Sequence, residues 1–99
     1  MIHLRLFLLL FLFISSCIDG VLTVYGIRSG LITEANPIMD WLYRQSSYGF
    51  LLLKVLLPVL LLLIIPKKVS KPLRNLLIAA CGIYLFILSL HGYWMMQLL

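Results

Sequence analysis

The chain has 99 residues, of which 64% are hydrophobic and only 11% are charged. So few charged side chains cannot cover a surface that faces water, so the composition excludes a soluble globular domain and indicates a membrane protein. Eight lysines and arginines against three acidic residues give a formal net charge of +5. This excess forms no basic stripe with interleaved aromatic residues, so nucleic acid is not an expected partner.

The first apolar segment covers about residues 4–26, and a bilayer crossing takes about 20 helical residues. Within it, Ile14-Ser15-Ser16-Cys17 is similar to the end of a lipoprotein signal, which would be cut before an acylated Cys17. The apolar run continues beyond Cys17 through Val24, and two more apolar segments follow. We therefore expect an uncleaved transmembrane helix. Neither Cys17 nor Cys81 has the spacing of a metal or redox site, and no cofactor is predicted.

The connection that follows is polar and contains one predicted helix, over about residues 37–44. Asn36 and Pro37 are typical of a helix start, because asparagine caps the first turn and proline suits its first position. Asp40 and Arg44 stand four residues apart and are expected to pair. The opposite face carries Ile38, Trp41 and Leu42. We expect a short amphipathic helix that lies at the membrane interface.

Two further apolar segments, about residues 48–65 and 73–96, complete the chain. The loop between them, residues 66–74, carries four basic residues, Lys67, Lys68, Lys71 and Arg74. Such a loop faces the cytoplasm under the positive-inside rule, which places the N-terminus inside and the C-terminus outside a prokaryotic inner membrane. The sequence thus predicts an all-α integral membrane protein, a single domain over residues 1–99 with three transmembrane helices and an interfacial helix in the first loop.

Each predicted span contains one charged or imidazole side chain deep within it: Asp19, Lys54 or His91. Such a side chain costs about 2.5–3.5 kcal/mol to insert at the centre of a membrane helix, so its presence needs an explanation. Counting along the helices at about 1.5 Å per residue places all three roughly 8–10 Å below the same end. Asp19 and Lys54 are therefore expected to pair.

Helix periodicity indicates which faces pack together. Ser15, Asp19, Thr23 and Gly26 form one stripe of small and polar residues on the first helix. A stripe on the third helix, Ala79, Gly82 and Ser89, leaves His91 on nearly the opposite side. We expect His91 to lie at the interface beside aromatic residues, as a doubtful member of the group. The candidate polar cluster is Asp19, Thr23, Glu34, Asn36 and Lys54.

This cluster has two interpretations that the sequence leaves open. It is either a structural ion pair that fixes the register of two helices, or a site in which two acids, Asp19 and Glu34, face one lysine. The site would bind a proton, a metal ion or a cationic group. No metal-binding motif, nucleophile turn or phosphate loop is present, so no catalytic residue can be named.

The same residues resemble a family of small prokaryotic integral membrane proteins known only as a domain of unknown function. The pattern of that family is Asp, Leu-Thr, Gly, Glu-x-Asn-Pro and Lys. It is matched by Asp19, Leu22, Thr23, Gly30, Glu34, Asn36, Pro37 and Lys54. The resemblance covers about residues 15–65. It implies that the polar residues belong together as one group, and it implies no reaction.

Our leading hypothesis is a non-enzymatic accessory or interaction protein that works in the lipid bilayer with a membrane-protein partner or a second copy of the chain. Two alternatives remain. One is a component of proton- or cation-linked transport. The other is a membrane-embedded hydrolase that uses Asp19 and Glu34.

Overall fold

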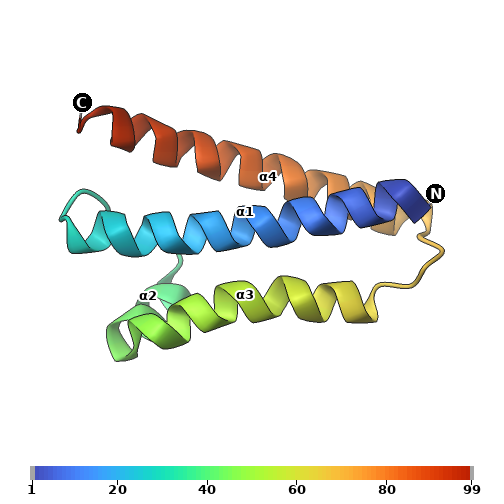
Figure 1. The fold of residues 1–99 in the computed structure, drawn as a ribbon, viewed down its shortest axis with the longest axis horizontal. Helices are drawn as coiled ribbons and strands as arrows, with labels where there is room; N and C mark the ends of the chain where they lie inside the picture. The colour runs from blue at the N-terminus through green and yellow to red at the C-terminus, as the bar shows by residue number, and fades with distance from the viewer. Residues whose placement is uncertain (1, 99) are drawn as a thin grey trace.

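A computed structural model describes residues 2–98, and Met1 and Leu99 lie outside the described part. Within these residues the chain forms four helices and no strand (Figure 1). They are α1 (Ile2–Arg28), α2 (Pro37–Gln45), α3 (Ser47–Ile64) and α4 (Lys71–Met96). Three of them, α1, α3 and α4, are long and apolar enough to cross a membrane. The predicted all-α membrane fold with three spans and one additional short helix is confirmed.

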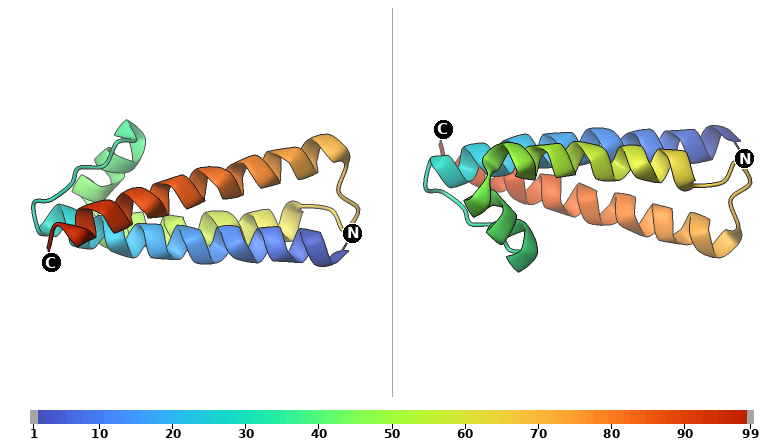
Figure 2. Two further views of the ribbon diagram at one scale, coloured as in Figure 1. Left: turned by 90° about the horizontal axis from the view of Figure 1, so that it is seen from above. Right: turned by 90° about the horizontal axis from the view of Figure 1, so that it is seen from below.

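Helix α1 is the centre of the bundle. Its backbone packs on those of both α3 and α4, whereas within residues 2–98 no Cα atom of α3 lies within 8 Å of one of α4 (Figures 1 and 2). The buried share of the apolar stretch is 50% in α1 and only 11% in each of α3 and α4. The N-terminus and the loop 65–70 lie at one end, and α2 and the C-terminus lie at the other (Figure 1). We call these the basic-loop end and the α2 end.

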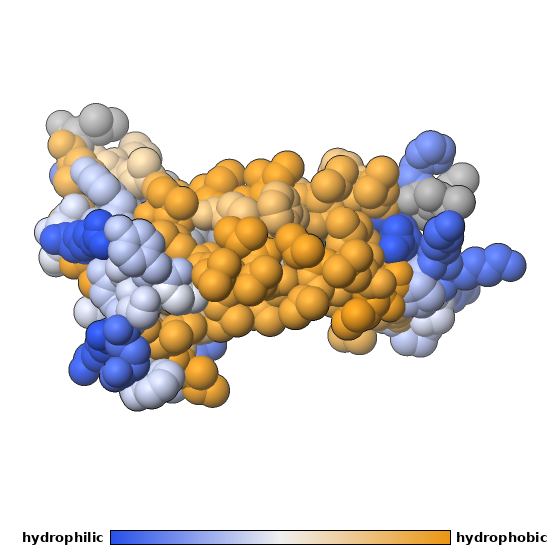
Figure 3. All heavy atoms as spheres, turned by 60° about the horizontal axis from the view of Figure 1, so that its bottom comes forward, coloured by the Kyte–Doolittle hydropathy of each residue, from blue (hydrophilic) through white to orange (hydrophobic). Residues whose placement is uncertain are grey.

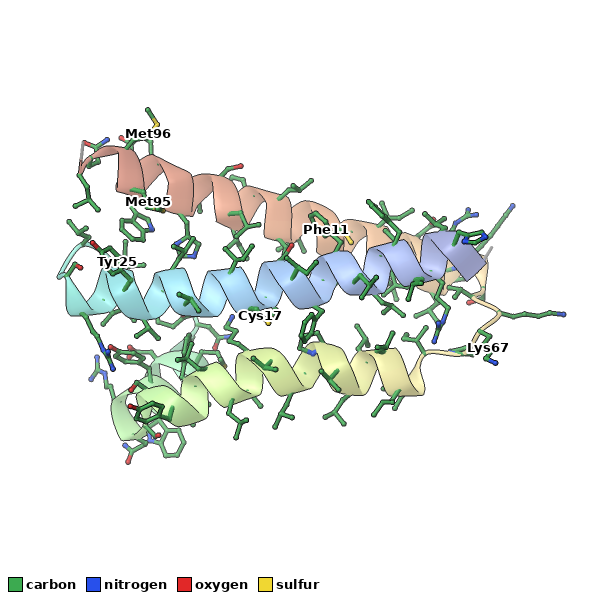
Figure 4. The ribbon with its side chains drawn as sticks, in the orientation of Figure 1. Phe11, Cys17, Tyr25, Lys67, Met95 and Met96 are labelled. Atoms are coloured by element: carbon green, nitrogen blue, oxygen red, sulfur yellow. The ribbon has the colours of Figure 1, made fainter. Side chains whose placement is uncertain are left out.

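The outer surface of the bundle is apolar between two polar ends. Figure 3 shows a continuous hydrophobic band across the middle of one face, with hydrophilic residues at both ends. Leu63, Leu76 and Phe86 are among the exposed large apolar side chains. Lys67 lies at the basic-loop end, whereas Tyr25 and Met95 lie toward the α2 end (Figure 4). Such a band suits the hydrocarbon core of a bilayer, which accepts exposed apolar surface.

The basic-loop end is closed by an apolar core. Leu8, Leu9 and Leu12 of α1 are buried against Leu77 and Cys81 of α4 and against Ile65, which follows α3. These α1 positions recur at a spacing of three to four residues and so lie on one side of the helix.

Arg5 closes the same end electrostatically. Its Nε donates to the backbone oxygen of Pro66 at 3.0 Å, and its Nη2 donates to that of Ile65 at 2.9 Å. The last carbonyls of a helix have no partner within the helix and form the negative end of its dipole. The arginine of α1 therefore caps α3.

The chain turns back sharply after α1. Gly30 has a φ of 73°, a left-handed conformation that suits glycine. The N–H of Leu31 donates to the oxygen of Gly26 at 2.9 Å, and that of Gly30 to Ile27 at 3.0 Å, which is a Schellman motif. A Cβ on Gly26 would lie 2.6 Å from Ile32 Cγ1, so only glycine allows the returning loop to pass this close.

The short helix α2 begins as predicted. The Oδ1 of Asn36 accepts from the N–H of Ile38 at 3.0 Å, Pro37 occupies the first turn, and Arg44 pairs with Asp40 at 3.1 Å.

Helix α2 packs sideways on the start of α3 and differs from the expectation in one respect. Met39 is buried with Val24 and Phe50, and Leu42 packs against this group. Leu42 therefore does not share an outer face with Trp41, which is exposed. The reason is that α2 packs on the start of α3.

Candidate functional site

Asp19 links all three long helices. Its Oδ2 accepts from Nζ of Lys54 on α3 at 2.8 Å, and its Oδ1 accepts from Nε2 of His91 on α4 at 2.7 Å. The side chains of Asp19, Lys54 and His91 are only 7%, 15% and 8% exposed. The expected contact between Asp19 and Lys54 is present, and each carboxylate oxygen serves a different helix.

His91 lies on the packed face of α4, whereas helix periodicity predicted the opposite face. The packed face of α4 consists of large side chains, Leu77, Cys81, His91 and Trp94, which are all buried. The expected stripe of Ala79, Gly82 and Ser89 is exposed, and a Cβ on Gly82 would have no neighbour within 4 Å. The expectation is wrong because large residues fill the space between α4 and α1. The signal that would have identified this face is the seven-residue spacing of large side chains at Leu77, Tyr84 and His91.

Trp94 determines which ring nitrogen of His91 carries the hydrogen. Its indole Nε1 donates to Nδ1 of His91 at 2.8 Å. An indole N–H can only donate, so Nδ1 holds a lone pair and Nε2 carries the hydrogen that points to Asp19. His91 is therefore neutral in this arrangement, and the only full charges among the buried groups are those of Asp19 and Lys54. Sequence reasoning had not placed Trp94 in the site.

Thr23 completes the buried network. It stands one turn after Asp19 on α1, and its Oγ1 lies 3.4 Å from Oδ1 of Asp19 and 3.4 Å from Nε2 of His91. Among the described residues, every buried side-chain nitrogen and oxygen has a hydrogen-bond partner. A network with all its members satisfied avoids the cost of an unpaired polar group in apolar surroundings.

The backbone around Lys54 is held by a second interaction that sequence reasoning missed. Pro58 has no N–H, so it cannot donate to the carbonyl of Lys54 four residues earlier. The hydroxyl of Ser16 on α1 donates to this carbonyl at 2.6 Å. Gly20 of α1 allows the approach, because a Cβ there would lie 3.2 Å from Cβ of Lys54. The proline four positions after the lysine was the available signal.

A groove lies between α3 and α4, because the backbones of these helices stay apart. At its α2 end it contains a cavity of about 410 Å³. The buried network lines this cavity together with the loop that returns from α1. The polar residues around it include Asp19, Thr23, Thr33, Glu34, Asn36, Lys54 and His91. All five members of the predicted cluster thus border one cavity, with His91 added.

Glu34 and Asn36 occupy the rim rather than the buried network. The Oε1 of Glu34 accepts from the backbone N–H of Asn36 at 3.2 Å. Asn36 is exposed and Glu34 is partly buried. Neither side chain hydrogen-bonds Asp19 or Lys54 within the described residues. Across residues 2–98, no three His, Cys, Asp or Glu side chains come close enough to hold a metal ion.

Comparison with known proteins identifies a family and no characterised relative. Neither the search of curated proteins nor that of solved structures found a match. A protein family described as "Domain of unknown function (DUF5658)" matches residues 10–97, which include nearly all of the three long helices. This agrees with the resemblance to an uncharacterised membrane family, while the individual residue pattern stays a prediction. The chain belongs to the DUF5658 family, whose function is unknown.

Proposed function

We propose that the chain is a non-enzymatic accessory protein that binds a membrane-resident ligand in the groove between α3 and α4. One observation carries the proposal: the backbones of both helices pack on that of α1 and not on each other, so that the polar cluster lines an open groove. Ligand sites in proteins are concave, mostly apolar and contain a few convergent polar groups, and this groove has each property. A purely structural ion pair would need no such groove.

The contacts of Asp19 argue against the hydrolase alternative. A general base needs a lone pair that faces the substrate or its attacking water. Both oxygens of Asp19 already accept hydrogen bonds, from Lys54 and from His91. The Nδ1 of His91, the other candidate base, accepts from Trp94. A hydrolase would have to rely on Glu34, whose Oε2 has no hydrogen bond within residues 2–98, without help from Asp19 as a base, and this makes catalysis by the pair the weaker proposal.

Transport of a proton or cation meets a different obstacle. The apolar core of Leu8, Leu9 and Leu12 with its partners fills the basic-loop end of the bundle. A charged species would have to cross this core, and apolar surroundings penalise an unpaired charge severely. Transport would therefore need a path between copies of the chain or along a partner protein. Such assemblies, like the transport role, stay predictions.

The proposed function is tested by filling the groove. Ala80 lines its apolar half and is partly buried, whereas the neighbouring Ala79 is exposed on the outer face of α4. The full-length chain is extracted from its own membrane in mild detergent, and molecules that stay bound are measured by native mass spectrometry. We expect Ala80→Trp to lower their occupancy about fivefold or more, because the indole displaces the ligand. Ala79→Trp is the control and should match the wild type.

Circular dichroism and thermal unfolding would show that both variants remain folded. Equal occupancy in the wild type and in both folded variants would refute binding in the groove.

We also propose that the basic-loop end faces the cytoplasm of an inner membrane. Lys67 and Lys68 are exposed there, and such charges are retained on the cytoplasmic side. The test uses single cysteines at Gln45 and Ser70, both exposed, in a chain without its native cysteines. In intact cells, an impermeant maleimide should label position 45 and leave position 70 unlabelled. The reverse pattern would overturn the orientation.

A further inference from the structure

Two cavities adjoin along the groove between α3 and α4. Asn36, Met39 and Lys54 line both of them. The cavity at the α2 end has a volume of about 410 Å³, and the second, of about 470 Å³, extends past Leu57 of α3 and Ala80 of α4. These volumes are typical of small-molecule pockets. A further helix with its side chains is about 10–12 Å across and would need far more space, so the groove suits an alkyl chain better than a helix.

The two cavities differ in polarity. The first is bordered by the carboxylates and hydrogen-bonding groups of the cluster. The second is bordered mainly by alkyl side chains, among them Leu12, Leu57 and Leu61. The hydroxyl of Ser16, which also lines the second cavity, is already bound to the carbonyl of Lys54. The groove therefore has a polar end for a head group and an apolar end for a tail.

The polar end carries one uncompensated negative charge. Asp19 and Glu34 are acidic, Lys54 is basic and pairs with Asp19, and His91 is neutral because of the bond from Trp94. Glu34 uses Oε1 for the N–H of Asn36, and its Oε2 has no hydrogen bond within residues 2–98.

The two charged residues that line a further pocket together with Glu34 pair with each other: Arg44 Nε lies 3.1 Å from Asp40 Oδ2. Glu34 therefore borders the groove with one carboxylate oxygen that has no hydrogen bond within residues 2–98.

We propose that the groove binds one membrane amphiphile with a primary ammonium head group, held by Glu34, and with its alkyl chain between Leu57 and Ala80. The inference rests on the proposed function and adds the class of ligand. A primary ammonium combines a positive charge with three N–H donors, and hydrogen bonds between ionised partners are the stronger ones. An anionic head group would instead meet an unpaired carboxylate.

The direction of the groove matches that of a lipid. Its polar cavity is lined by residues 32–36 before α2, at the α2 end, and its apolar cavity extends from there past Leu57 of α3 and Ala80 of α4. An amphiphile in that leaflet has its head at the boundary and its tail in the hydrocarbon core. Such a molecule can enter sideways between α3 and α4 without turning over or leaving the leaflet.

The test compares three probes with one tail and different heads: hexadecylamine, hexadecanol and hexadecanoate. Each is titrated into the full-length chain in an uncharged detergent, at equal mole fractions in the micelle, and the bound fraction is measured by native mass spectrometry. Hexadecylamine should bind at least about tenfold more tightly than hexadecanol, since the net contribution of a hydrogen bond to a charged group corresponds to at least this ratio. Hexadecanoate should bind most weakly. Equal affinities for the three probes would overturn the inference.

Variants assign the preference to its residues. Glu34→Gln should lower the affinity for hexadecylamine to that for hexadecanol and leave hexadecanol unchanged. The control removes an acid outside the groove together with its partner, Asp40→Asn with Arg44→Gln, and should keep the preference for the amine. Ala80→Trp should weaken binding of both probes, and Ala79→Trp should weaken neither.

The two proposals fail in different ways. If a natural ligand depends on Ala80 but has a neutral or anionic head group, the inference about the ammonium is wrong and the proposed function stands. If a transmembrane segment of another protein crosslinks to the groove and displaces hexadecylamine, the amphiphile is the wrong occupant. If no bound molecule depends on Ala80, both proposals fail.

Discussion

The hydrogen bond from Ser16 to the carbonyl of Lys54 should stabilise the bundle only while residue 58 is a proline. Ser16→Ala leaves that carbonyl without its 2.6 Å donor, and Pro58 offers no N–H in its place. An unsatisfied buried acceptor costs about 1–3 kcal/mol, while hydrogen bonds between membrane helices average about 0.6 and reach about 1.7 kcal/mol. The short distance places this bond near the upper value, so we expect a loss of about 1.5 kcal/mol. With Pro58→Ala, the new N–H binds the carbonyl, and Ser16→Ala should then cost less than about 0.5 kcal/mol.

The assay is a double-mutant cycle. The free energy of unfolding is measured for the wild type, both single variants and the double variant in detergent micelles, by titration with a denaturing detergent and circular dichroism. Ser89→Ala is a matched control, since Ser89 is exposed and donates to the Leu85 carbonyl of its own helix at 2.8 Å. It should cost little with either residue at position 58. If Ser16→Ala costs the same in both backgrounds, to within about 0.3–0.5 kcal/mol, the reasoning about Pro58 is wrong.

Three further predictions follow from the same contacts. Asp19→Leu or Lys54→Met alone should lower the free energy of unfolding by about 3–5 kcal/mol. The double variant should recover all but about 1 kcal/mol of this loss, because the N–H of His91 has lost its acceptor. Losses that simply add would show that the two charges do not interact. Nitrogen NMR of the His91 imidazole should show a single tautomer protonated at Nε2 in the wild type and a mixture of tautomers in Trp94→Phe. A wild-type ring protonated at Nδ1 would contradict the assignment. Arg5→Met should lower the free energy of unfolding by about 1–2 kcal/mol and speed hydrogen exchange at the C-terminal end of α3 in particular, so that a uniform change along the chain would argue against capping.

Features that depend on local sequence were predictable. The three spans follow from the length of each apolar run, and the start of α2 follows from the Asn36-Pro37 pair, because both signals act within one helix. The contact between Asp19 and Lys54 also could be predicted. Two opposite charges at the same depth in apolar surroundings have few other partners, so burial itself brings them together.

Features that depend on helix rotation could not be derived in the same way. Whether His91 meets Asp19 is decided by which side of α4 packs on α1, and the small residues near Gly82 indicated the wrong side. The bond from Ser16 is equally non-local, since it exists only because α1 passes Pro58 at close range. Sequence periodicity identifies candidate faces, and only packing decides between them.

The two oxygens of Asp19 have a mechanical consequence for the groove. One oxygen holds Lys54 of α3 and the other holds His91 of α4, two helices whose backbones do not pack on each other. A carboxylate is flat and rigid, so a rotation of the Asp19 side chain moves both oxygens together and disturbs both contacts. The positions of α3 and α4 at this level are therefore coupled through one carboxylate, and any molecule that pushes the helices apart strains these contacts.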